Sequence, residues 1–293
     1  MSARTNGRTP EAQVNGRTPE VRVNRRTPEV RAVGAPDAVN EVLVMGDGDP
    51  VVLVAHAWGA SARVMLPTVA GVPGTLVAVN FRGYGGSSPR PDGWTYADLA
   101  AELAGVARVV GASAAVGQSM GAGALLALAD QEPDLFTTLA LLLPPAVDEP
   151  IPAEIHEMFR RVHVARLAGE PEALRAEIAR CMSPQLRDAR GGAVYLRAYA
   201  LMLMACSAPT ERPGNAPVPD RARLVRVRAR TLVVGQDGDL IHRTGTAHEL
   251  AAALPHARVH VFPATAPMWS ERLALRTLLT DHLTRNTPGP DSK

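Results

Sequence analysis

Short apolar runs and longer segments of helical spacing alternate along most of the chain. Near-continuous apolar runs are typical of parallel strands covered on both faces, and they occur at residues 51–55, 76–79, 114–116, 139–143, 231–234 and 259–262. Helical spacing is found at residues 96–110, 119–131, 246–254 and 271–283. This alternation indicates βαβ units. We therefore expect an α/β fold with a doubly wound, mostly parallel sheet that binds ligands at the carboxyl ends of its strands.

One long stretch interrupts the alternation. Residues 150–219 contain helical patterns at 155–167, 171–182 and 194–205 and a proline-rich return at 208–219, without a convincing strand. A helical insertion between two strands of a sheet predicts a lid. Four of its methionines are candidates for lining an adaptable apolar pocket, although methionine at helical spacing is more often plain core: Met158, Met182, Met202 and Met204.

The amino terminus is a short repeat rich in arginine. Three similar copies occupy residues 6–14, 15–23 and 24–33, and this period is far below the roughly 20 to 50 residues of a solenoid unit. We expect residues 1–29 to form a disordered tail, with the end of the last copy supplying a first strand. The expected organisation continues with a core at 30–149 and 220–286, the helical lid at 150–219 and a flexible end at 287–293.

Composition limits the class of protein. With 46% hydrophobic and 20% charged residues among 293, the chain can bury a large core in one domain with a lid. Two cysteines, Cys181 and Cys206, fit buried thiols in a reducing compartment better than a disulfide scaffold. No stretch approaches a membrane span or a secretory signal, so we expect a cytoplasmic protein. Arginine far exceeds lysine, which occurs only at position 293, as in GC-rich bacterial genes.

The sequence Gly-Gln-Ser-Met-Gly at 117–121 directly follows one predicted strand and begins one predicted helix. Glycines two residues before and after Ser119 permit a sharp strand-to-helix turn that exposes the serine hydroxyl above the sheet. The strand before the motif and the helix after it are the context that a nucleophile elbow requires. The chemistry that this motif predicts is acyl transfer.

Further motifs stand in a consistent order around the elbow. Residues 46–59 are similar to a strand followed by a His-Gly turn, with Ala57 in place of the glycine. Residues 80–87 resemble an Asp-x-Arg-Gly-x-Gly-x-Ser loop, with Asn80 in place of the aspartate. Together with the elbow and the strand after it, these motifs resemble the α/β-hydrolase fold superfamily over residues 41–284. The resemblance implies that Ser119 is the nucleophile and that the backbone N–H groups of Trp58 and Met120 form an oxyanion hole.

The resemblance also implies an acid at the end of the strand near residue 234. Asp239 fits this position best, because the apolar residues usually found after the acid are then supplied by Leu240 and Ile241. Asp237 is the second candidate and Asp148, after the preceding strand, is the third. Each of the three could instead be a solvated turn carboxylate.

The expected base is absent from its usual place. In the family a histidine follows the last strand, where this chain has Pro267, and without an imidazole a serine hydroxyl is a weak nucleophile. His242 is the best substitute, although an aspartate and a histidine three residues apart on one loop are not expected to reproduce the usual geometry. Other histidines are weaker candidates: His56 with a structural role, His156 and His163 on the lid, His282 as a surface residue of the last helix, and His248, His256 and His260.

Two functions follow from these observations. The first is hydrolysis, through Ser119 and a substitute base, of an ester, thioester or related acyl bond in a small apolar substrate. The alternative is a hydrolase-like protein with an incomplete triad that binds a ligand or catalyses a nonhydrolytic step such as a cyclisation or lyase reaction. We expect no cofactor and no metal, and neither nucleic acid nor membrane as a partner, because the folded part has no basic patch. The sequence indicates no oligomeric state.

Overall fold

A computed structural model describes residues 27–35, 38–205, 212–265, 268 and 270–284. Of the disordered tail predicted at 1–29, residues 1–26 fall outside the described residues, whereas Glu29 is the first residue of a strand. The flexible end predicted at 287–293, as well as Cys206 and Pro267, also falls outside them. Among the helices that are described, none is long and apolar enough to cross a membrane.

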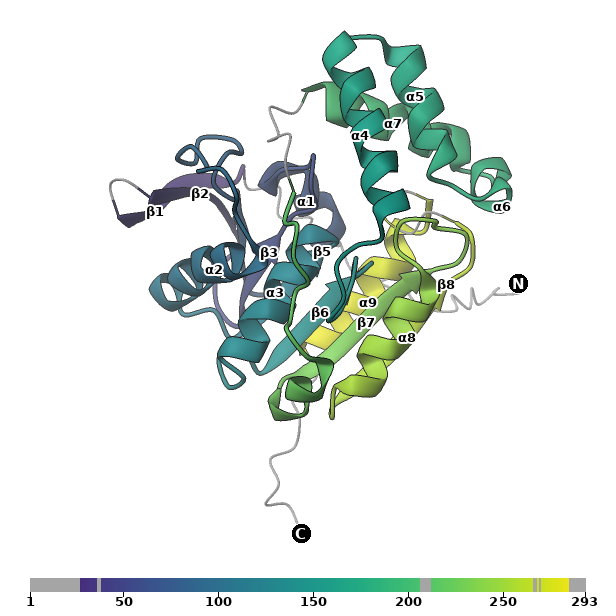
Figure 1. Ribbon diagram of the computed structural model, residues 1–293. Coiled ribbons are helices and arrows are strands. Elements are labelled where there is room, and N and C mark those ends of the chain that lie inside the picture. Colours follow the sequence, from purple (N-terminus) through teal and green to yellow (C-terminus); the bar gives the residue numbers. More distant parts are fainter. Residues whose placement is uncertain (1–26, 36–37, 206–211, 266–267, 269, 285–293) are drawn as a thin grey trace, which may run out of the picture.

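A sheet of eight strands forms the centre of the molecule, in the order β1-β2-β4-β3-β5-β6-β7-β8 (Figure 1). β1 pairs antiparallel with β2, and β2 pairs antiparallel with β4, whereas all later pairs are parallel. The mostly parallel doubly wound α/β sheet is therefore confirmed. The strands are β1 (Glu29–Ala35), β2 (Ala38–Met45), β3 (Val51–Ala55), β4 (Thr75–Val79), β5 (Ala114–Gln118), β6 (Thr138–Leu142), β7 (Arg230–Gln236) and β8 (Ala257–Phe262).

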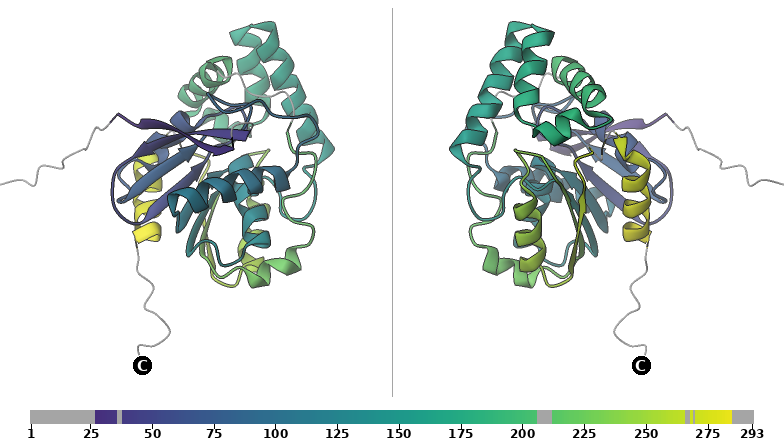
Figure 2. Two further views of the ribbon diagram at one scale, coloured as in Figure 1. Left: turned by 90° about the vertical axis from the view of Figure 1, so that its left-hand side faces the viewer. Right: turned by 90° about the vertical axis from the view of Figure 1, so that its right-hand side faces the viewer.

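Helices cover both faces of the sheet. One face carries α1 (Ala62–Val69) and α9 (Arg272–Thr284), and the other carries α2 (Tyr96–Val110), α3 (Met120–Gln131) and α8 (Thr244–Ala253). Figure 2 shows α9, in yellow, on the opposite side of the sheet from α2 and α3. The two faces explain the unbroken apolar runs, since Val52 and Val54 of β3 face α1 and α9 while Leu53 and Ala55 face the other layer.

A helical insertion separates β6 from β7. It contains α4 (Ala153–Ala168), α5 (Pro171–Arg180), α6 (Pro184–Asp188) and α7 (Gly192–Ala205), and the chain then returns through the 3₁₀ helix η1 (Arg221–Arg226) to β7. In Figure 1 these helices project from the sheet near the carboxyl ends of its parallel strands. The three helical patterns predicted there correspond to α4, α5 and α7, whereas the short α6 was not predicted.

Two other elements escaped the hydrophobic pattern. α1 has a proline at position 67 within the helix, and proline argues against a helix interior because it lacks an N–H donor. In β2 the apolar residues are interrupted by Asn40 and Glu41, which take part in the polar network described below. The last helix also corrects an expectation: His282 is not a surface residue but is 1% exposed, and its Nε2 lies 2.9 Å from the carbonyl oxygen of Leu139.

Candidate active site

Ser119 stands at the sharp turn between β5 and α3. Its backbone has φ 49° and ψ −112°, a region that L-residues seldom adopt and that costs about 1–3 kcal/mol. The flanking glycines make this turn sterically feasible. A Cβ atom at Gly117 would collide with the backbone of Gly121, and one at Gly121 would collide with the carbonyl groups of Ala55 and His56. The elbow predicted from the sequence is therefore present, with Ser119 9% exposed.

The close approach of Gly121 brings the first turn of α3 against the turn that follows β3. Met120 is the first residue of α3, and the first N–H groups of a helix have no acceptor within the helix. They also carry the positive end of the helix dipole. The backbone N–H of Met120 can therefore serve an anion formed above Ser119.

His56 fixes the turn that carries Trp58. Its Nδ1 lies 2.8 Å from the carbonyl oxygen of Ala57, and its Nε2 accepts a hydrogen bond from the backbone N–H of Phe81 at 3.3 Å. Complete burial lowers the pKa of His56 to about 4, so the ring is neutral with its proton on Nδ1. Because the peptide unit is planar and trans, holding the Ala57 carbonyl also sets the direction of the Trp58 N–H.

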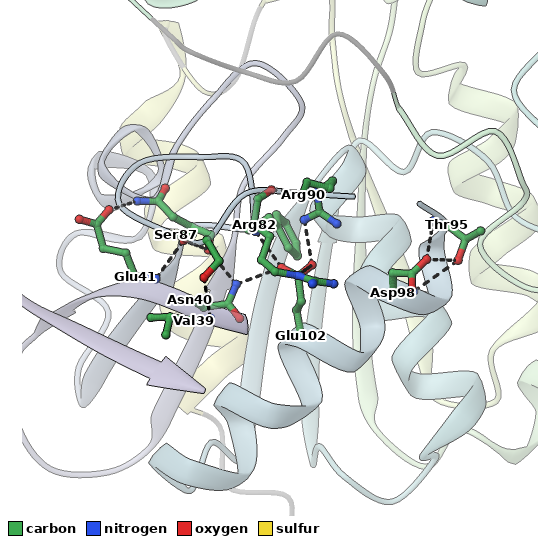
Figure 3. A network of polar contacts seen from close by, with 12 residues as sticks. Val39, Asn40, Glu41, Arg82, Ser87, Arg90, Thr95, Asp98 and Glu102 are labelled. Atoms are coloured by element: carbon green, nitrogen blue, oxygen red, sulfur yellow. Dashed lines mark hydrogen bonds and ion pairs between the residues drawn. The ribbon is translucent and has the colours of Figure 1, made fainter. Parts of the chain in front are cut away.

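A buried polar network holds the loop that contains Phe81 (Figure 3). The Glu102 carboxylate of α2 accepts hydrogen bonds from the Asn40 side chain at 2.9 Å and from the backbone N–H of Arg82 at 2.9 Å, and it pairs with Arg90 at 2.9 Å. The side chains of Glu102 and Arg90 are 6% and 2% exposed. Removing one partner of so buried a pair is strongly destabilising. The network therefore stabilises the loop whose Phe81 N–H donates to His56.

The asparagine that replaces the expected aspartate belongs to the same region. The Oδ1 of Asn80 accepts a hydrogen bond from the backbone N–H of Ala62, at the start of α1, at 2.8 Å, and its Nδ2 donates to the Glu41 carboxylate. An aspartate here would place a second carboxylate against Glu41. The amide supplies both the acceptor and the donor that the two neighbours require.

Ser119, His242 and Asp239 form a continuous chain of hydrogen bonds. His242 Nε2 lies 2.8 Å from Ser119 Oγ, and His242 Nδ1 lies 2.8 Å from Asp239 Oδ2. An ionised carboxylate only accepts hydrogen bonds, so it holds the ring proton on Nδ1 and leaves Nε2 to accept the serine proton. The side chains of His242 and Asp239 are each 13% exposed.

The loop after β7 therefore corrects the expectation that an acid and a base three residues apart cannot reproduce this geometry. Asp239 Oδ1 accepts hydrogen bonds from the backbone N–H groups of Ile241 at 2.8 Å and His242 at 3.0 Å. These bonds fold the chain into a tight turn around the carboxylate. The turn brings the His242 ring back onto Oδ2, a local fold that spacing alone does not reveal.

The environment keeps Asp239 charged. Burial disfavours its ionised form, but the His242 imidazole and the backbone donors of His242 and Ile241 outweigh that effect and lower the pKa below its ordinary value. Cys181, which also lines the site, behaves differently. Burial, with the nearby Asp239 charge, raises the pKa of its thiol to about 11, so it remains protonated and is not a competing nucleophile.

The helical insertion holds the same loop by backbone hydrogen bonds. The N–H of Ser183 donates to the carbonyl of Gly238 at 2.9 Å, and the N–H of Leu240 donates to the carbonyl of Cys181 at 3.4 Å. Met182 and Asp239 form an isolated antiparallel bridge between these bonds. The segment between α5 and α6 thus fixes the positions of Asp239 and His242.

The other candidate acids do not reach His242. Asp237 is exposed and accepts a hydrogen bond from Thr244 Oγ1 at 3.1 Å. Asp148 forms an ion pair with Arg221 at 2.6 Å, and this guanidinium holds the pKa of the carboxyl below its ordinary value. Of the three aspartates, only Asp239 contacts the histidine that contacts Ser119.

The remaining histidines lie away from the serine. His156 contacts Arg212, with 3.2 Å between His156 Nδ1 and the guanidinium, and His163 lies beside the Trp58 ring, with centroids 6.5 Å apart. Neither lines the cavity above Ser119. The three on α8 and around β8 are exposed: His248, His256 and His260.

A cavity of about 290 Å³ opens above Ser119. Trp58 forms part of its wall, and so do Met182 and Met202 of the insertion. Of the other two candidate methionines, Met158 packs against the core, the alternative that the sequence left open, and Met204 is 38% exposed. Two glutamines at strand ends, Gln118 and Gln236, also line the cavity, and their position directly after apolar runs was a signal that sequence reasoning missed.

Comparison with known proteins identifies the family of this chain. A family model described as the alpha/beta hydrolase fold matches residues 50–268. The chain belongs to the α/β-hydrolase fold family. No curated protein matches the sequence.

Solved structures of other α/β hydrolases are similar along nearly their whole length. Carboxylesterase CesB from Bacillus subtilis has a TM-score of 0.73 at 13% identity, covering 90% of this chain and 94% of that chain. A hydrolase from Pseudomonas aeruginosa PA01 has a TM-score of 0.64 at 20% identity, covering 86% and 96%. A thermophilic esterase from Thermogutta terrifontis has a TM-score of 0.66 at 20% identity, covering 88% and 100%. At these identities the similarity shows the fold, and function must be argued from the site.

Proposed function

We propose that this α/β hydrolase cleaves an ester, thioester or related acyl bond of a small substrate through Ser119, His242 and Asp239. The observation that carries the proposal is the 2.8 Å contact between Ser119 Oγ and His242 Nε2, in a ring whose other nitrogen faces the Asp239 carboxylate. This contact supplies the base whose apparent absence favoured the nonhydrolytic alternative. No observation in the described residues now favours a cyclase, lyase or binding role over acyl transfer.

The chemistry of the first half-reaction follows from these contacts. Ser119 Oγ attacks the acyl carbon while its proton passes to His242 Nε2, and Asp239 stabilises the imidazolium that forms. The carbonyl oxygen becomes an oxyanion, to which the backbone N–H groups of Met120 and Trp58 donate. His242 then gives its proton to the leaving oxygen or sulfur as the bond to the acyl carbon breaks.

The second half-reaction repeats these steps with water. His242 takes a proton from the water that attacks the acyl-enzyme, and the collapse of the second oxyanion returns a proton to Ser119 and releases the acid. In this scheme the helical insertion acts as a lid that limits access of bulk water to the acyl-enzyme. Loss of an oxyanion donor costs roughly 3 kcal/mol in such reactions.

Labelling with a fluorophosphonate tests the proposal directly. An activated serine forms a covalent adduct, and mass spectrometry should place it on Ser119 and find none in Ser119→Ala. His242→Ala should slow labelling and turnover of p-nitrophenyl butyrate by several orders of magnitude, since loss of the histidine from a working triad can cost about a millionfold in turnover.

His248→Ala is the matched control, because His248 is an exposed histidine of the neighbouring helix α8. It should label and turn over as the wild type does. An unlabelled wild-type protein, under conditions that label an ordinary esterase, would rule out the proposed function. Equal rates for His242→Ala and the wild type would rule out His242 as the base.

A further inference from the structure

The cavity above Ser119 has walls of two chemical kinds. Beneath the helical insertion the wall is mostly apolar, with Phe159, Val162 and Ile178 among its residues. The opposite wall is formed by the sheet with α1 and α9, and it contributes four polar side chains: Thr68 from α1, Arg272 from α9, and Gln118 and Gln236 from the strand ends. Ser119 and His242 line the same cavity. A substrate that fills it therefore meets a mainly apolar wall on the side of the insertion and, on the side of the sheet, four polar side chains among apolar ones such as Leu143 and Met268.

The strand register places the two glutamines on one face of the sheet. Gln118 of β5 is level with Leu142 of β6, which is level with Val234 of β7. Side chains at matched positions of parallel strands point to the same face, and residues two apart along a strand share it. Leu142 and Val234 belong to the core against α1 and α9. Gln118 and Gln236 therefore extend this apolar face into the cavity as a pair of amides.

These amides are poorly explained by packing alone. Gln236 is 4% exposed, yet neither its side-chain amide nor that of Gln118 has a hydrogen-bond partner within the described residues. Both amides line the cavity and are not sealed from solvent, so water can satisfy them until a ligand displaces it. Two amides without a protein partner, in the cavity that Ser119 also lines, are available to a polar group of a ligand.

The charge of Arg272 indicates which polar group. Its Nε donates to the carbonyl of Met268 at 3.1 Å, which holds this side chain at the polar wall. A guanidinium and the NH₂ groups of two amides are all donors, and donors suit an anionic oxygen. We infer that this wall, the carboxylate subsite of Gln118, Gln236 and Arg272, binds a carboxylate carried by the ester substrate. The inference rests on the proposed function and names the substrate class: a short ester with a free carboxylate at one end.

Two matched sets of esters test the subsite. In the acyl set, monomethyl succinate is compared with methyl succinamate and methyl isohexanoate, which replace the carboxylate by an amide or by an apolar group of the same shape. In the alcohol set, the butyrate ester of β-hydroxypropionic acid is compared with isoamyl butyrate. The carboxylate ester should have the highest kcat/KM in at least one set. A preference for the apolar ester in both sets would overturn the inference.

Substitution of the amide then assigns the preference to the subsite. Gln236→Leu removes the hydrogen-bonding atoms at similar volume, and the ratio of kcat/KM for the carboxylate ester to that for its apolar analogue should fall about tenfold to a hundredfold, as expected for a lost hydrogen bond to a charged group. Arg272→Met should lower the same ratio. Gln131→Leu, at an exposed glutamine that ends α3, is the matched control and should leave it unchanged. An unchanged ratio in Gln236→Leu would mean that water alone satisfies the amide, and would refute the subsite.

The two proposals fail in different ways. Turnover of all esters without preference, with Ser119 labelled by fluorophosphonate, would refute the carboxylate subsite and leave the proposed function intact. No labelling and no turnover would refute the proposed function. In that case calorimetric titration with monomethyl succinate tests whether the subsite binds a carboxylate. Binding by the wild type together with weaker binding by Gln236→Leu would support the subsite. No binding by the wild type would reject it.

Discussion

The substitution Asp239→Asn separates the two sets of contacts made by one carboxylate. Oδ1 accepts from the backbone N–H groups of Ile241 and His242, and Oδ2 faces His242 Nδ1 at 2.8 Å. An asparagine can keep the oxygen at the first position and place its NH₂ at the second. Because an NH₂ cannot accept from Nδ1–H, the ring proton must move to Nε2, which then cannot take the proton of Ser119.

The structure gives this substitution a small effect on stability and a large effect on rate. The two backbone hydrogen bonds survive, and the charge-assisted bond to Nδ1 is replaced by a neutral one from the NH₂ group, so the free energy of unfolding should fall by no more than about 1.5–3 kcal/mol. The wrong tautomer in a triad of this kind costs about 10⁴ in kcat, or roughly 5.4 kcal/mol of activation free energy. Asp239→Ala should lose the two turn bonds as well, and about 1 kcal/mol of stability with each.

The assay combines kcat for p-nitrophenyl butyrate, the rate of fluorophosphonate labelling, and urea unfolding of the same preparations. Asp237→Asn is the matched control, because Asp237 lies two residues away on the same loop, is exposed, and among the described residues its side chain forms a hydrogen bond only with Thr244. It should retain wild-type turnover. If Asp239→Asn keeps turnover within tenfold of the wild type, the carboxylate does not set the tautomer of His242 and the reasoning fails.

Two further predictions follow from other contacts. Burial lowers the pKa of both His56 and His282 from 6.5 to about 4. Between roughly pH 6 and 4.5 the unfolded chain therefore binds two protons that the folded protein does not bind. From this source the free energy of unfolding should fall by about 2.7 kcal/mol for each unit by which the pH is lowered in this range. Urea titrations should show half of that slope lost in His282→Gln, and an undiminished slope would contradict the assignment. Ser183→Pro removes the N–H that donates to Gly238 while matching the native φ of −63°. Ser183→Ala loses only the side-chain hydrogen bond that caps α6. The proline variant should lower kcat about fivefold more than the alanine variant, because it also lacks one hydrogen bond of about 1 kcal/mol to the loop. Equal kcat values for the two variants would show that this bond does not position the acid and base.

The sequence predicted the central strands because their apolar runs have a single physical cause. A strand such as β3, buried on both faces, must be apolar throughout. The glycines on either side of Ser119, between an apolar strand and a helix of small residues, likewise predict the sharp turn at Ser119. The resemblance to the hydrolase family also ranked Asp239 first among the three candidate acids, and the structure brings its carboxylate into contact with His242. These predictions depend on local patterns that the fold preserves.

The contact of His242 with Ser119 was harder to predict because it depends on a hydrogen-bonded turn. His242 and Asp239 are close in sequence, but only the two backbone bonds to Oδ1 direct the ring toward Ser119. The glutamines of the cavity wall depend on strand register, which brings together residues more than a hundred positions apart. No period along the chain encodes either relationship, so both required the three-dimensional structure.

The placement of both Asp239 and His242 after β7 has a consequence for how the site withstands local opening. β7 is an interior strand, paired on both sides with β6 and β8, whereas β8 is an edge strand with one neighbour. Edges fray at lower free energy than interiors. A base on the loop after β8 would be lost from the site whenever that edge detached, but here the histidine is anchored to a strand that opens only with the centre of the sheet. The hydrogen-bonded chain from Asp239 to Ser119 therefore spans β5 and β7 and persists through fluctuations at the edge of the sheet.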